Sequence, residues 1–518
     1  MSSDLKACEY IAGRVYYVPL SASPSTALMQ KHHFFSIDQE LVYWNFFYDF
    51  GPLNLGHLYR FCTMLNNKLA DPKLKEKIIY FYSGSHAHKK ANASFLISAW
   101  AILYMNRTPE EAFRPVRGLG LPLWHDATNT VCSFQLTVLD TLKGLDKARK
   151  CNFFDFQSFD IDEYEYFEQV ENGDLNWCMD GKFIAFAGPH ASKESLDGYR
   201  TLTPDDYVPY FKRKNVTLVV RLNKKYYDAK RFTMNGIDHM ELYYLDGSVP
   251  TFDILNAFLV RCEETPGAVA VHCKAGLGRT GTCIGAYMMK HFHFTAEECI
   301  GWLRIVRPGS VIGPQQQYMK DMQARLWREG ESYRERMGGP GVGMMPPGRS
   351  PNAVRVMSDE GASGSERDSS SSSGLPATLF SGVNSLSLNS RSNPASRQAS
   401  SNSTTPLPLI RSSSGKSAGD KTPPSAEAKG KEHSGTDSKG MPQLIRGSSV
   451  DSTSSKEATT QGDHLRVRRQ QIANEQAAKN TVKITSPPSP TGSSPSTPGS
   501  SGSRTPGFTS RFLSSWRK

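Results

Sequence analysis

A cysteine and an arginine stand in the stretch AVAVHCKAGLGRTGT, which runs from Ala268 to Thr282. Cys273 follows a short apolar run that predicts a buried strand, and Arg279 opens a run of helix formers. The loop between them contains two glycines, which adopt backbone angles that other residues resist. The N–H groups of such a loop and the positive end of the helix dipole both favour an anion. The spacing therefore predicts a cup for a tetrahedral dianion such as phosphate.

The same surroundings would make the thiol reactive. Helix N-termini and adjacent cations favour the thiolate form of cysteine, so we expect Cys273 to be a nucleophile at neutral pH. Arg279 would bind two oxygens of the anion with its planar fork of donors. Thr280 would donate its hydroxyl to the sulfur, and His272 would shape the loop rather than transfer protons. The residues expected to bind phosphate are Lys274, Ala275, Gly276, Leu277, Gly278 and Arg279.

Hydrolysis through a phosphocysteine also needs an acid for the leaving oxygen and a positioned water. The stretch YYLDGSVP places Asp246 at a predicted strand end, upstream of the cysteine. Asp246 could supply the proton, although an Asp-Gly pair is equally typical of a plain turn. Farther on, RPGSVIGPQQQYM predicts a helix that begins at Pro314. Gln315 and Gln316 could position the water, or could form only a polar first turn.

Strands and helices alternate along the first two thirds of the chain, which predicts an α/β fold with a mostly parallel sheet. The chain also repeats itself, because residues 92–112 resemble residues 279–299 when the sequence is shifted by 187 positions. In this register Cys273 corresponds to His86 and Arg279 to Asn92. Chance similarity of two amphipathic helices is the alternative explanation. The expected strands are 77–82, 216–222, 240–245 and 267–273, and the expected helices are 91–105, 280–292 and 295–306.

Composition divides the chain near Met337. Residues 337–518 contain 22 Lys and Arg against 12 Asp and Glu, whereas the preceding residues contain 39 against 38. The basic charge therefore belongs to the tail, which could contact acidic partners, and the near-neutral first part disfavours nucleic-acid binding by folded domains. The tail is rich in Ser, Gly, Pro and Thr, and we expect it to be disordered because it cannot bury enough apolar surface.

The nine cysteines all precede residue 300 and form no C-x-x-C pair. No apolar segment is typical of a signal peptide or of a membrane span. We therefore expect a soluble protein of a reducing compartment, nuclear or cytoplasmic.

Five motifs, in order, resemble the Cdc14 family of dual-specificity phosphatases. They are FSIDQELVYWNFFYDFGPLN, DEYEYFEQVENGDLNW, VVRLNKKYYDAKRF, VHCKAGLGRTGT and RPGSVIGPQQ. The resemblance covers about residues 5–335 and implies two tandem phosphatase-like domains, of which only the second is active. It implies Cys273 as nucleophile, Arg279 as phosphate clamp and Asp246 as general acid, and we expect no metal or organic cofactor.

The resemblance also implies a substrate class. Family members prefer phosphoserine followed by proline, as proline-directed cell-cycle kinases leave it, and act on phosphotyrosine in vitro. An acidic groove between the domains would receive basic residues after the proline, and the matching residues are Glu165, Glu168 and Asp174. Family resemblance further implies roles in mitotic exit, cytokinesis and cell-cycle control, with centrosome or spindle association.

We expect four segments. They are a degenerate phosphatase-like domain (1–154), an acidic linker (155–178), a catalytic domain (179–336) and a disordered tail (337–518). The spacing of leucines from Leu379 to Leu388 is typical of a nuclear export signal, which would let the protein shuttle. Ser-Pro and Thr-Pro steps fit regulation by proline-directed kinases, although composition alone yields several; they occur at Ser350, Thr405, Thr422, Ser486, Ser489, Ser494, Thr497 and Thr505.

Three other functions share parts of this pattern. A phosphoinositide phosphatase would typically carry a second lysine where this chain has Leu277. An RNA 5′-phosphatase would need a basic track, which the near-neutral first part lacks. A scaffold that binds phosphopeptides without turnover would not need the intact set of Cys273, Arg279 and Asp246.

Overall fold

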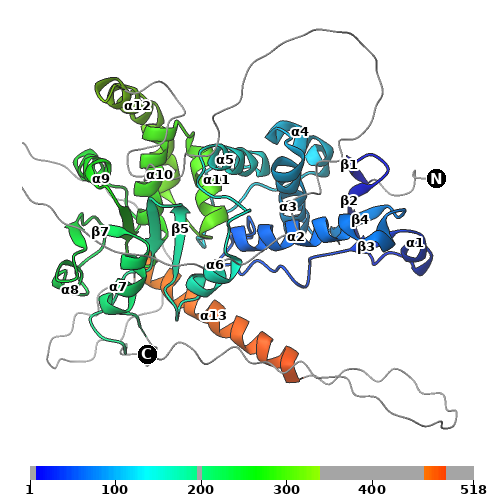
Figure 1. Cartoon of the computed structure of the whole chain (residues 1–518), viewed down its shortest axis with the longest axis horizontal. Coiled ribbons are helices and arrows are strands. Elements are labelled where there is room, and N and C mark those ends of the chain that lie inside the picture. The colour runs from blue at the N-terminus through cyan, green and yellow to red at the C-terminus, as the bar shows by residue number, and fades with distance from the viewer. Residues whose placement is uncertain (1–6, 195–200, 339–459, 486–518) are drawn as a thin grey trace, which may run out of the picture. The chain divides into compact units, whose positions relative to one another are not determined.

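The computed structural model describes residues 7–194, 201–338 and 460–485 (Figure 1). The strands are β1 (Cys8–Ile11), β2 (Val15–Leu20), β3 (His33–Phe35), β4 (Ile79–Gly84), β5 (Leu175–Met179), β6 (Phe183–Phe186), β7 (Val216–Arg221), β8 (Asp238–Glu241) and β9 (Ala268–His272). The helices are α1 (Thr26–Lys31), α2 (Leu55–Ala70), α3 (Ala87–Met105), α4 (Pro109–Phe113), α5 (Val138–Lys150), α6 (Ile161–Glu168), α7 (Pro204–Arg213), α8 (Lys230–Thr233), α9 (Phe252–Glu264), α10 (Gly278–Phe292), α11 (Ala296–Val306), α12 (Pro314–Arg336) and α13 (Gln461–Thr485). Two 3-10 turns, η1 (Pro72–Leu74) and η2 (Arg114–Leu119), complete the described elements.

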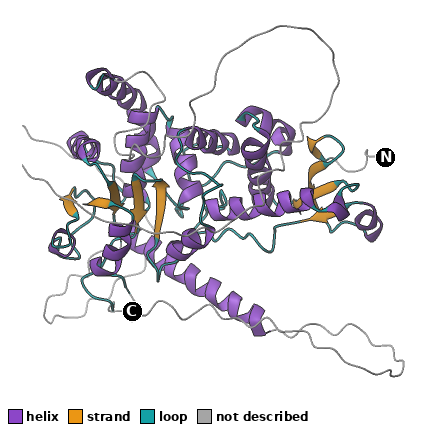
Figure 2. Cartoon of the chain, viewed as in Figure 1, coloured by secondary structure: helices purple, strands orange, loops and turns teal. Residues whose placement is uncertain are grey.

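The strands form two separate sheets (Figure 2). The first has the order β1-β2-β4-β3 and the second the order β5-β6-β9-β7-β8. Only β1 and β5, at one edge of each sheet, pair antiparallel. The predicted α/β fold with two mostly parallel sheets is therefore confirmed. The central strand β9 is buried at every position, as expected for a parallel strand covered on both faces.

The two units repeat each other beyond the helices that suggested the repeat. α3 and α10 both end in a left-handed residue, Asn106 with φ 51° and His293 with φ 58°. The next helix of each unit begins at a threonine, Thr108 or Thr295, that forms a capping box with a glutamate three residues later. Asn106 and His293, and likewise Thr108 and Thr295, are separated by the same 187 positions as the sequence repeat. Such matching of caps argues against chance similarity.

The first unit lacks the loop that would hold an anion. Residues 273–277 separate β9 from α10, whereas only residues 85 and 86 separate β4 from α3. The first turn of α3 thus replaces most of the loop. Asn92, which corresponds to Arg279, uses its side chain to bond the backbone of the segment before α2. The first unit therefore keeps the scaffold without the cup.

The two units share one apolar core, and α5 and α11 lie side by side between the sheets (Figure 1). Two glycines permit this close approach. A Cβ at Gly301 would lie 2.8 Å from the Cα of Thr141, and a Cβ at Gly144 would overlap the backbone of α11. Lys147 on α5 also pairs with Glu298 on α11 at 2.9 Å. The core thus continues from the first sheet to the second.

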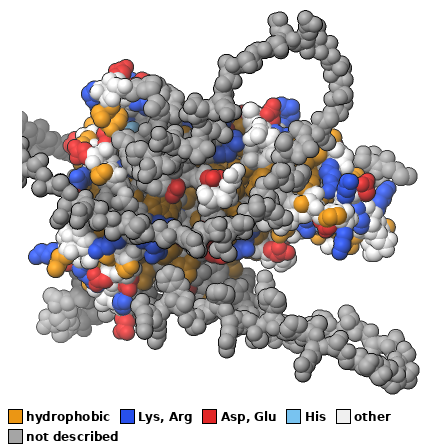
Figure 3. Space-filling view, viewed as in Figure 1, with side chains coloured by type: hydrophobic (Ala, Val, Ile, Leu, Met, Phe, Trp, Pro, Cys, Tyr) orange, Lys and Arg blue, Asp and Glu red, His pale blue; other side chains and the backbone are white. Residues whose placement is uncertain are grey.

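Some elements differ from the sequence-based expectation. β8 covers residues 238–241 rather than 240–245, although the N–H groups of Leu242 and Tyr244 still donate to the carbonyls of Arg221 (2.9 Å) and Leu222 (3.3 Å) beyond its end. The acidic linker contains the short helix α6. In the visible described surface, basic and acidic side chains are interspersed (Figure 3), which agrees with the balanced charge of the residues before 337. No helix in the described ranges is long and apolar enough to cross a membrane.

The tail also contains a helix that the sequence did not predict. α13 lies within the segment expected to be disordered and buries Leu465 and Ile472, seven residues apart and so on one face. The average composition of the tail concealed this helix. The stretch Leu379–Leu388 and the eight Ser-Pro and Thr-Pro steps lie outside the described residues.

Candidate active site

Cys273 lies directly after β9 and is 4% exposed. The loop that follows needs glycine at Gly276, because φ is +68° and a Cβ would overlap the backbone of Phe186. The fully buried Arg307 donates from Nε to the carbonyl of Gly276 (2.8 Å) and from Nη2 to that of Ala275 (3.0 Å). A peptide N–H points opposite to its carbonyl, so the next N–H groups face away from Arg307. This arrangement leaves loop donors free for an anion.

Arg279 and Asp246 are brought together beside this loop. Nη2 of Arg279 lies 3.0 Å from Oδ1 of Asp246, and Nη1 donates to the carbonyl of Tyr244 at 2.9 Å. Arg279 is 3% exposed. The ion pair and the carbonyl contact together fix the plane of the guanidinium near Cys273. The predicted acid and the predicted clamp therefore lie within direct contact of each other.

Two buried donors at this place have no partner. They are Nε of Arg279 and the hydroxyl of Thr280. The hydrogen bond expected from Thr280 to the sulfur is thus absent, because the hydroxyl of this helical residue lies outside bonding distance of it. An unpaired buried donor costs about 1–3 kcal/mol. An oxyanion that accepts from Arg279 would remove that cost.

His272 takes part in a buried chain of hydrogen bonds. Its Nδ1 contacts the carbonyl of Cys273 (2.9 Å), and its Nε2 contacts the hydroxyl of Tyr227 (2.7 Å), which also contacts Nε2 of His239 (2.9 Å). Burial lowers the pKa of His272 to about 3, so the ring is neutral. A carbonyl only accepts, so Nδ1 carries the proton and Tyr227 donates to Nε2. His272 therefore shapes the loop, as expected, and holds its proton away from the sulfur.

The two glutamines differ in their surroundings. Gln315 donates from Nε2 to the carbonyl of Ser248 (3.1 Å), two residues after Asp246, and its Oε1 lies 2.7 Å from where a Cβ of Gly278 would be. It thus touches both the acid loop and the phosphate loop. Gln316 instead bonds Arg304 at 2.8 Å, away from these loops. Of the pair, Gln315 is the one placed near the reacting groups.

The predicted phosphate-loop side chains point in several directions. Leu277 and Ala275 are buried in an apolar cluster with Ile312 and Phe46. Lys274 has its ammonium 5.7 Å from the ring centre of Tyr226. Only the backbone of residues 274–278 is therefore available to an anion in the cup, together with Arg279.

The three predicted groove carboxylates are not equivalent. Asp174, 4% exposed, pairs with Arg307 at 2.8 Å and so connects the groove to the phosphate loop. Glu168 accepts both bonds from Nδ2 of Asn54, each at 3.0 Å. Burial raises the pKa of Glu168, although neighbouring arginines oppose this. Glu165 is more exposed and pairs with Arg60 of α2 at 2.5 Å. The structure thus brings Glu168 and Asp174 together, and Glu165 lies at the edge.

The N-terminal part of α13 lies on this site. The N–H of Gly462 donates to Oδ2 of Asp246 at 2.8 Å, and Asp463 pairs with Lys274. One turn later, Arg466 donates to the carbonyl of Gly188 at 2.7 Å, and Arg469 pairs with Asp174 at 2.6 Å. Leu465 and Ile472 join the apolar cluster of Leu277. A segment of the tail therefore contacts the acid, the loop and the groove.

Sequence reasoning did not identify Arg307, Tyr227 or Asp126 as parts of the site. Arg307 directly follows the predicted helix 295–306, and Tyr227 and Asp126 are far from the cysteine in sequence. A buried arginine between two loops leaves no local pattern, so only its place beside Pro308 and Gly309 in a turn could have drawn attention to it.

Comparisons with known proteins agree with this geometry. Residues 9–148 match the family model of the N-terminal half of dual-specificity protein phosphatases, and residues 205–325 match that of the dual-specificity phosphatase catalytic domain. The chain is 50% identical over 334 residues to dual specificity protein phosphatase CDC14A of Homo sapiens, covering 64% of this chain and 56% of that protein. It is 48% identical over 331 residues to CDC14B of Mus musculus and to CDC14C of Homo sapiens, covering 64% of this chain and 68% and 74% of those proteins. The chain therefore spans little more than half of the first of these relatives, but most of the other two, and it belongs to the Cdc14 family of dual-specificity phosphatases.

Proposed function

We propose that the chain is a protein phosphatase that hydrolyses phosphoserine, phosphothreonine and phosphotyrosine esters through a phosphocysteine. The observation that supports this most directly is the meeting of Cys273, Arg279 and Asp246 around one glycine loop. Arg279 and Asp246 contact each other at 3.0 Å, and the loop carbonyls are held away by Arg307.

In the first step the thiolate of Cys273 attacks phosphorus and the bond from phosphorus to the leaving oxygen breaks. The phosphate replaces Asp246 as the partner of Arg279 and so frees Asp246 to face the leaving oxygen. Asp246 then gives its proton to the leaving oxygen. Loop N–H groups and Arg279 stabilise the charge that builds on the equatorial oxygens.

In the second step water attacks the phosphocysteine. Asp246, now a carboxylate, accepts a proton from the water, and the bond between phosphorus and sulfur breaks. Gln315 is placed to orient this water, because it contacts both the acid loop and the phosphate loop. Inorganic phosphate leaves and the thiolate is restored.

We further propose that the preferred substrates carry phosphoserine before proline and basic residues beyond it. Support comes from the groove itself, since Asp174 already holds the guanidinium of Arg469 at 2.6 Å. Carboxylates placed in this way orient a cationic peptide segment and speed its encounter. The partners would be phosphoproteins marked by proline-directed kinases, in nuclear and cytoplasmic cell-cycle events such as mitotic exit.

Two rival functions are less well supported. Leu277 is buried in the apolar cluster, so its position offers no cation to the additional phosphates of an inositol lipid. A scaffold that only binds phosphopeptides would not need an acid such as Asp246 beside Arg279.

The test is a panel of phosphopeptides that vary the residue after phosphoserine and the charge beyond it. We expect the highest kcat/KM for proline followed by lysine or arginine. Cys273→Ser should abolish turnover and keep phosphopeptide affinity. Hydrolysis at a near-parent rate by the serine variant would mean that Cys273 is not the nucleophile.

A further inference from the structure

The loop between α11 and α12 holds an unusual backbone. Val311 has φ of +57°, a left-handed conformation that β-branched residues rarely adopt. Gly313, two residues later, has φ 55° and ψ −131°, which is open essentially to glycine alone. Such conformations persist only where the surrounding contacts enforce them, and they cluster at functional sites.

This loop touches the groups of the proposed reaction. The N–H of Val311 approaches the carbonyl of Leu277 in the phosphate loop at 3.5 Å. The N–H of Ile312 donates to Oε1 of Gln315 at 3.2 Å, and Nε2 of Gln315 donates to Ser248 in the acid loop. The conformation of the loop thus decides where the side chain of Gln315 lies.

Arg304 holds the loop from within the catalytic domain. It is 2% exposed and donates to the carbonyls of Ser310 (3.1 Å) and Val311 (2.9 Å) and to Oε1 of Gln316 (2.8 Å). Burial lowers the pKa of its guanidinium, and the carboxylate of Asp126 opposes that shift. Arg304 therefore relies on a negative charge supplied from outside its own domain.

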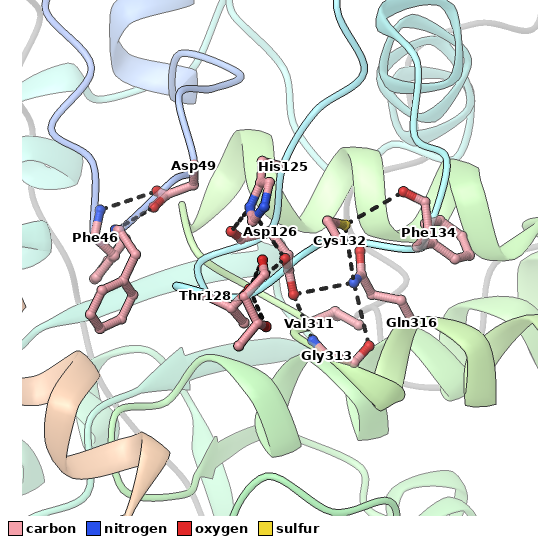
Figure 4. Close-up of polar contacts among 12 residues, drawn as sticks. Phe46, Asp49, His125, Asp126, Thr128, Cys132, Phe134, Val311, Gly313 and Gln316 are labelled. Atoms are coloured by element: carbon pink, nitrogen blue, oxygen red, sulfur yellow. Dashed lines mark hydrogen bonds and ion pairs between the residues drawn. The ribbon is translucent and has the colours of Figure 1, made fainter. Parts of the chain in front are cut away.

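Asp126 holds the loop from the first domain (Figure 4). Its Oδ2 accepts from the N–H of Gly313 at 2.7 Å and from Nε2 of Gln316 at 3.3 Å, and its Oδ1 accepts from the hydroxyl of Thr128 at 2.9 Å. Gly313 is the N-cap of α12 and has no side chain with which to cap it. A carboxylate at this place satisfies a free N–H and complements the helix dipole. Asp126, 2% exposed, therefore caps α12 across the domain boundary.

We propose that Asp126 is a positioning residue for the hydrolysis of the phosphocysteine. It fixes the first turn of α12, and that turn carries Gln315 to the water in the second step. The first domain, which has no anion cup of its own, thus completes the active site of the second. The inference rests on the proposed phosphatase function.

The test compares burst and steady-state kinetics on an activated aryl phosphate, using the full-length chain. In Asp126→Ala, the rate of the initial burst, which reports attack by Cys273, should stay within about twofold of the parent. The steady-state kcat should fall roughly tenfold. KM should fall by the same factor as kcat, so that kcat/KM stays unchanged. The reason is that kcat/KM reports only the steps up to formation of the phosphocysteine. A fall in kcat/KM equal to the fall in kcat, without a burst, would overturn the proposal.

A double-mutant cycle separates positioning from general loss of stability. Asp126→Ala should cost less than twofold in kcat when Gln315 is already alanine, since the two residues act through one group. An equal cost in both backgrounds would overturn the proposal. Asp126→Asn keeps the side-chain volume and an acceptor for the N–H of Gly313, so this variant should fold, and its kcat should fall less than that of Asp126→Ala. If Asp126→Ala does not fold, Asp126→Asn takes its place in the cycle. Unchanged kcat in every Asp126 variant would also overturn it.

A matched control is Asp146→Ala, which removes another buried carboxylate of the first domain, one paired only with Arg149 and Lys150 of its own helix. It should leave the ratio of burst rate to kcat unchanged. A parent protein without turnover would contradict the proposed function itself, whereas an active parent with insensitive Asp126 variants would contradict only this inference.

Discussion

Asp246 has two partners that a substrate must replace, the guanidinium of Arg279 and the N–H of Gly462. The acid role of Asp246 therefore depends on the substrate displacing both of them. This makes Asp246 a residue whose function appears only when substrate is bound.

Replacement of Asp246 by Asn should therefore affect substrates unequally. For a phosphoserine peptide, whose leaving alkoxide needs a proton, kcat/KM should fall by about 100-fold or more. For an aryl phosphate with a good leaving group the fall should be much smaller. Steady-state assays on both substrates measure the difference, with Asp253→Asn, an exposed carboxylate in α9, as control. Equal losses of kcat/KM on both substrates would mean that Asp246 is not the general acid.

Glu168 should give the groove a distinctive pH dependence. Burial raises its pKa, so it holds its proton up to a higher pH than an exposed glutamate, whose pKa is about 4.5. As pH falls, Glu168 becomes neutral early, and the attraction for a basic peptide weakens while exposed carboxylates are still charged. The ratio of kcat/KM for peptides with and without a lysine beyond the proline should thus decline on acidification starting above pH 4.5. In Glu168→Gln this decline in the ratio should be absent. If the decline persisted in that variant, a group other than Glu168 would be its cause.

At this scale the sequence predicted what depends on local spacing. The loop after β9 begins with Cys273 and leads into the first turn of α10, which contains Arg279, and Arg279 contacts Asp246 at 3.0 Å. The roles of Arg307 and Asp126 were missed, because their hydrogen bonds reach segments far away in the sequence, and local spacing does not reveal such contacts. The bond expected from Thr280 is absent, since spacing alone does not determine the direction of a side chain.

Among the elements, α13 has the most direct bearing on activity. Its contacts with Asp246, Lys274 and Asp174 use the same groups that a phosphopeptide would use. Binding of peptide and docking of α13 should therefore exclude each other.

Removal of residues 456–518 should tighten phosphopeptide binding by several-fold. The reason is that a competing segment lowers apparent affinity by the fraction of molecules that it occupies. Titration of a phosphopeptide into Cys273→Ser chains, with and without the tail, measures the change. Leu465→Asp in the intact chain should act in the same direction, because it places a charge in the apolar cluster with Leu277. Unchanged or weaker affinity in both variants would contradict competition.

Helices with capping residues and periodic apolar residues were predictable from the sequence. Elements whose bounds depend on contacts with distant segments were not. The repeat was visible in the sequence because both threonine caps and both helix ends recur. β8 was misplaced because an isolated apolar run does not reveal where its partner strand stops. α13 was missed because its buried apolar residues, Leu465 and Ile472, are few, and because the surrounding tail is rich in Ser, Gly, Pro and Thr.

At the scale of the whole molecule, the two domains share one apolar core. A single core cluster contains residues of both sheets, and α5 meets α11 through Gly144 and Gly301. Because Asp126 also caps α12 across this boundary, separation of the domains would remove both packing and a part of the site.

Replacement of Gly301 by Ala tests whether the two domains unfold together. In an ordinary helix alanine is the better former, but here its Cβ would lie 2.8 Å from Thr141 Cα. We expect a loss of about 1–3 kcal/mol in the free energy of unfolding, in one transition that both domains share. Denaturant unfolding followed by tryptophan fluorescence and circular dichroism measures it. Gly118→Ala, where no atom lies within 4 Å, should change little, and two separate transitions in Gly301→Ala would show that the domains unfold independently.

The docking of α13 has a consequence for how the protein responds to its own abundance. A ligand joined to its site by the same polypeptide has a local concentration that depends on the connecting chain and not on the number of molecules in solution. Dilution would therefore not release α13, and neither would a rise in expression strengthen its hold. A stronger competitor, a loss of the apolar contacts of Leu465, or a loss of the arginine contacts with Asp174 and Gly188 would shift that balance.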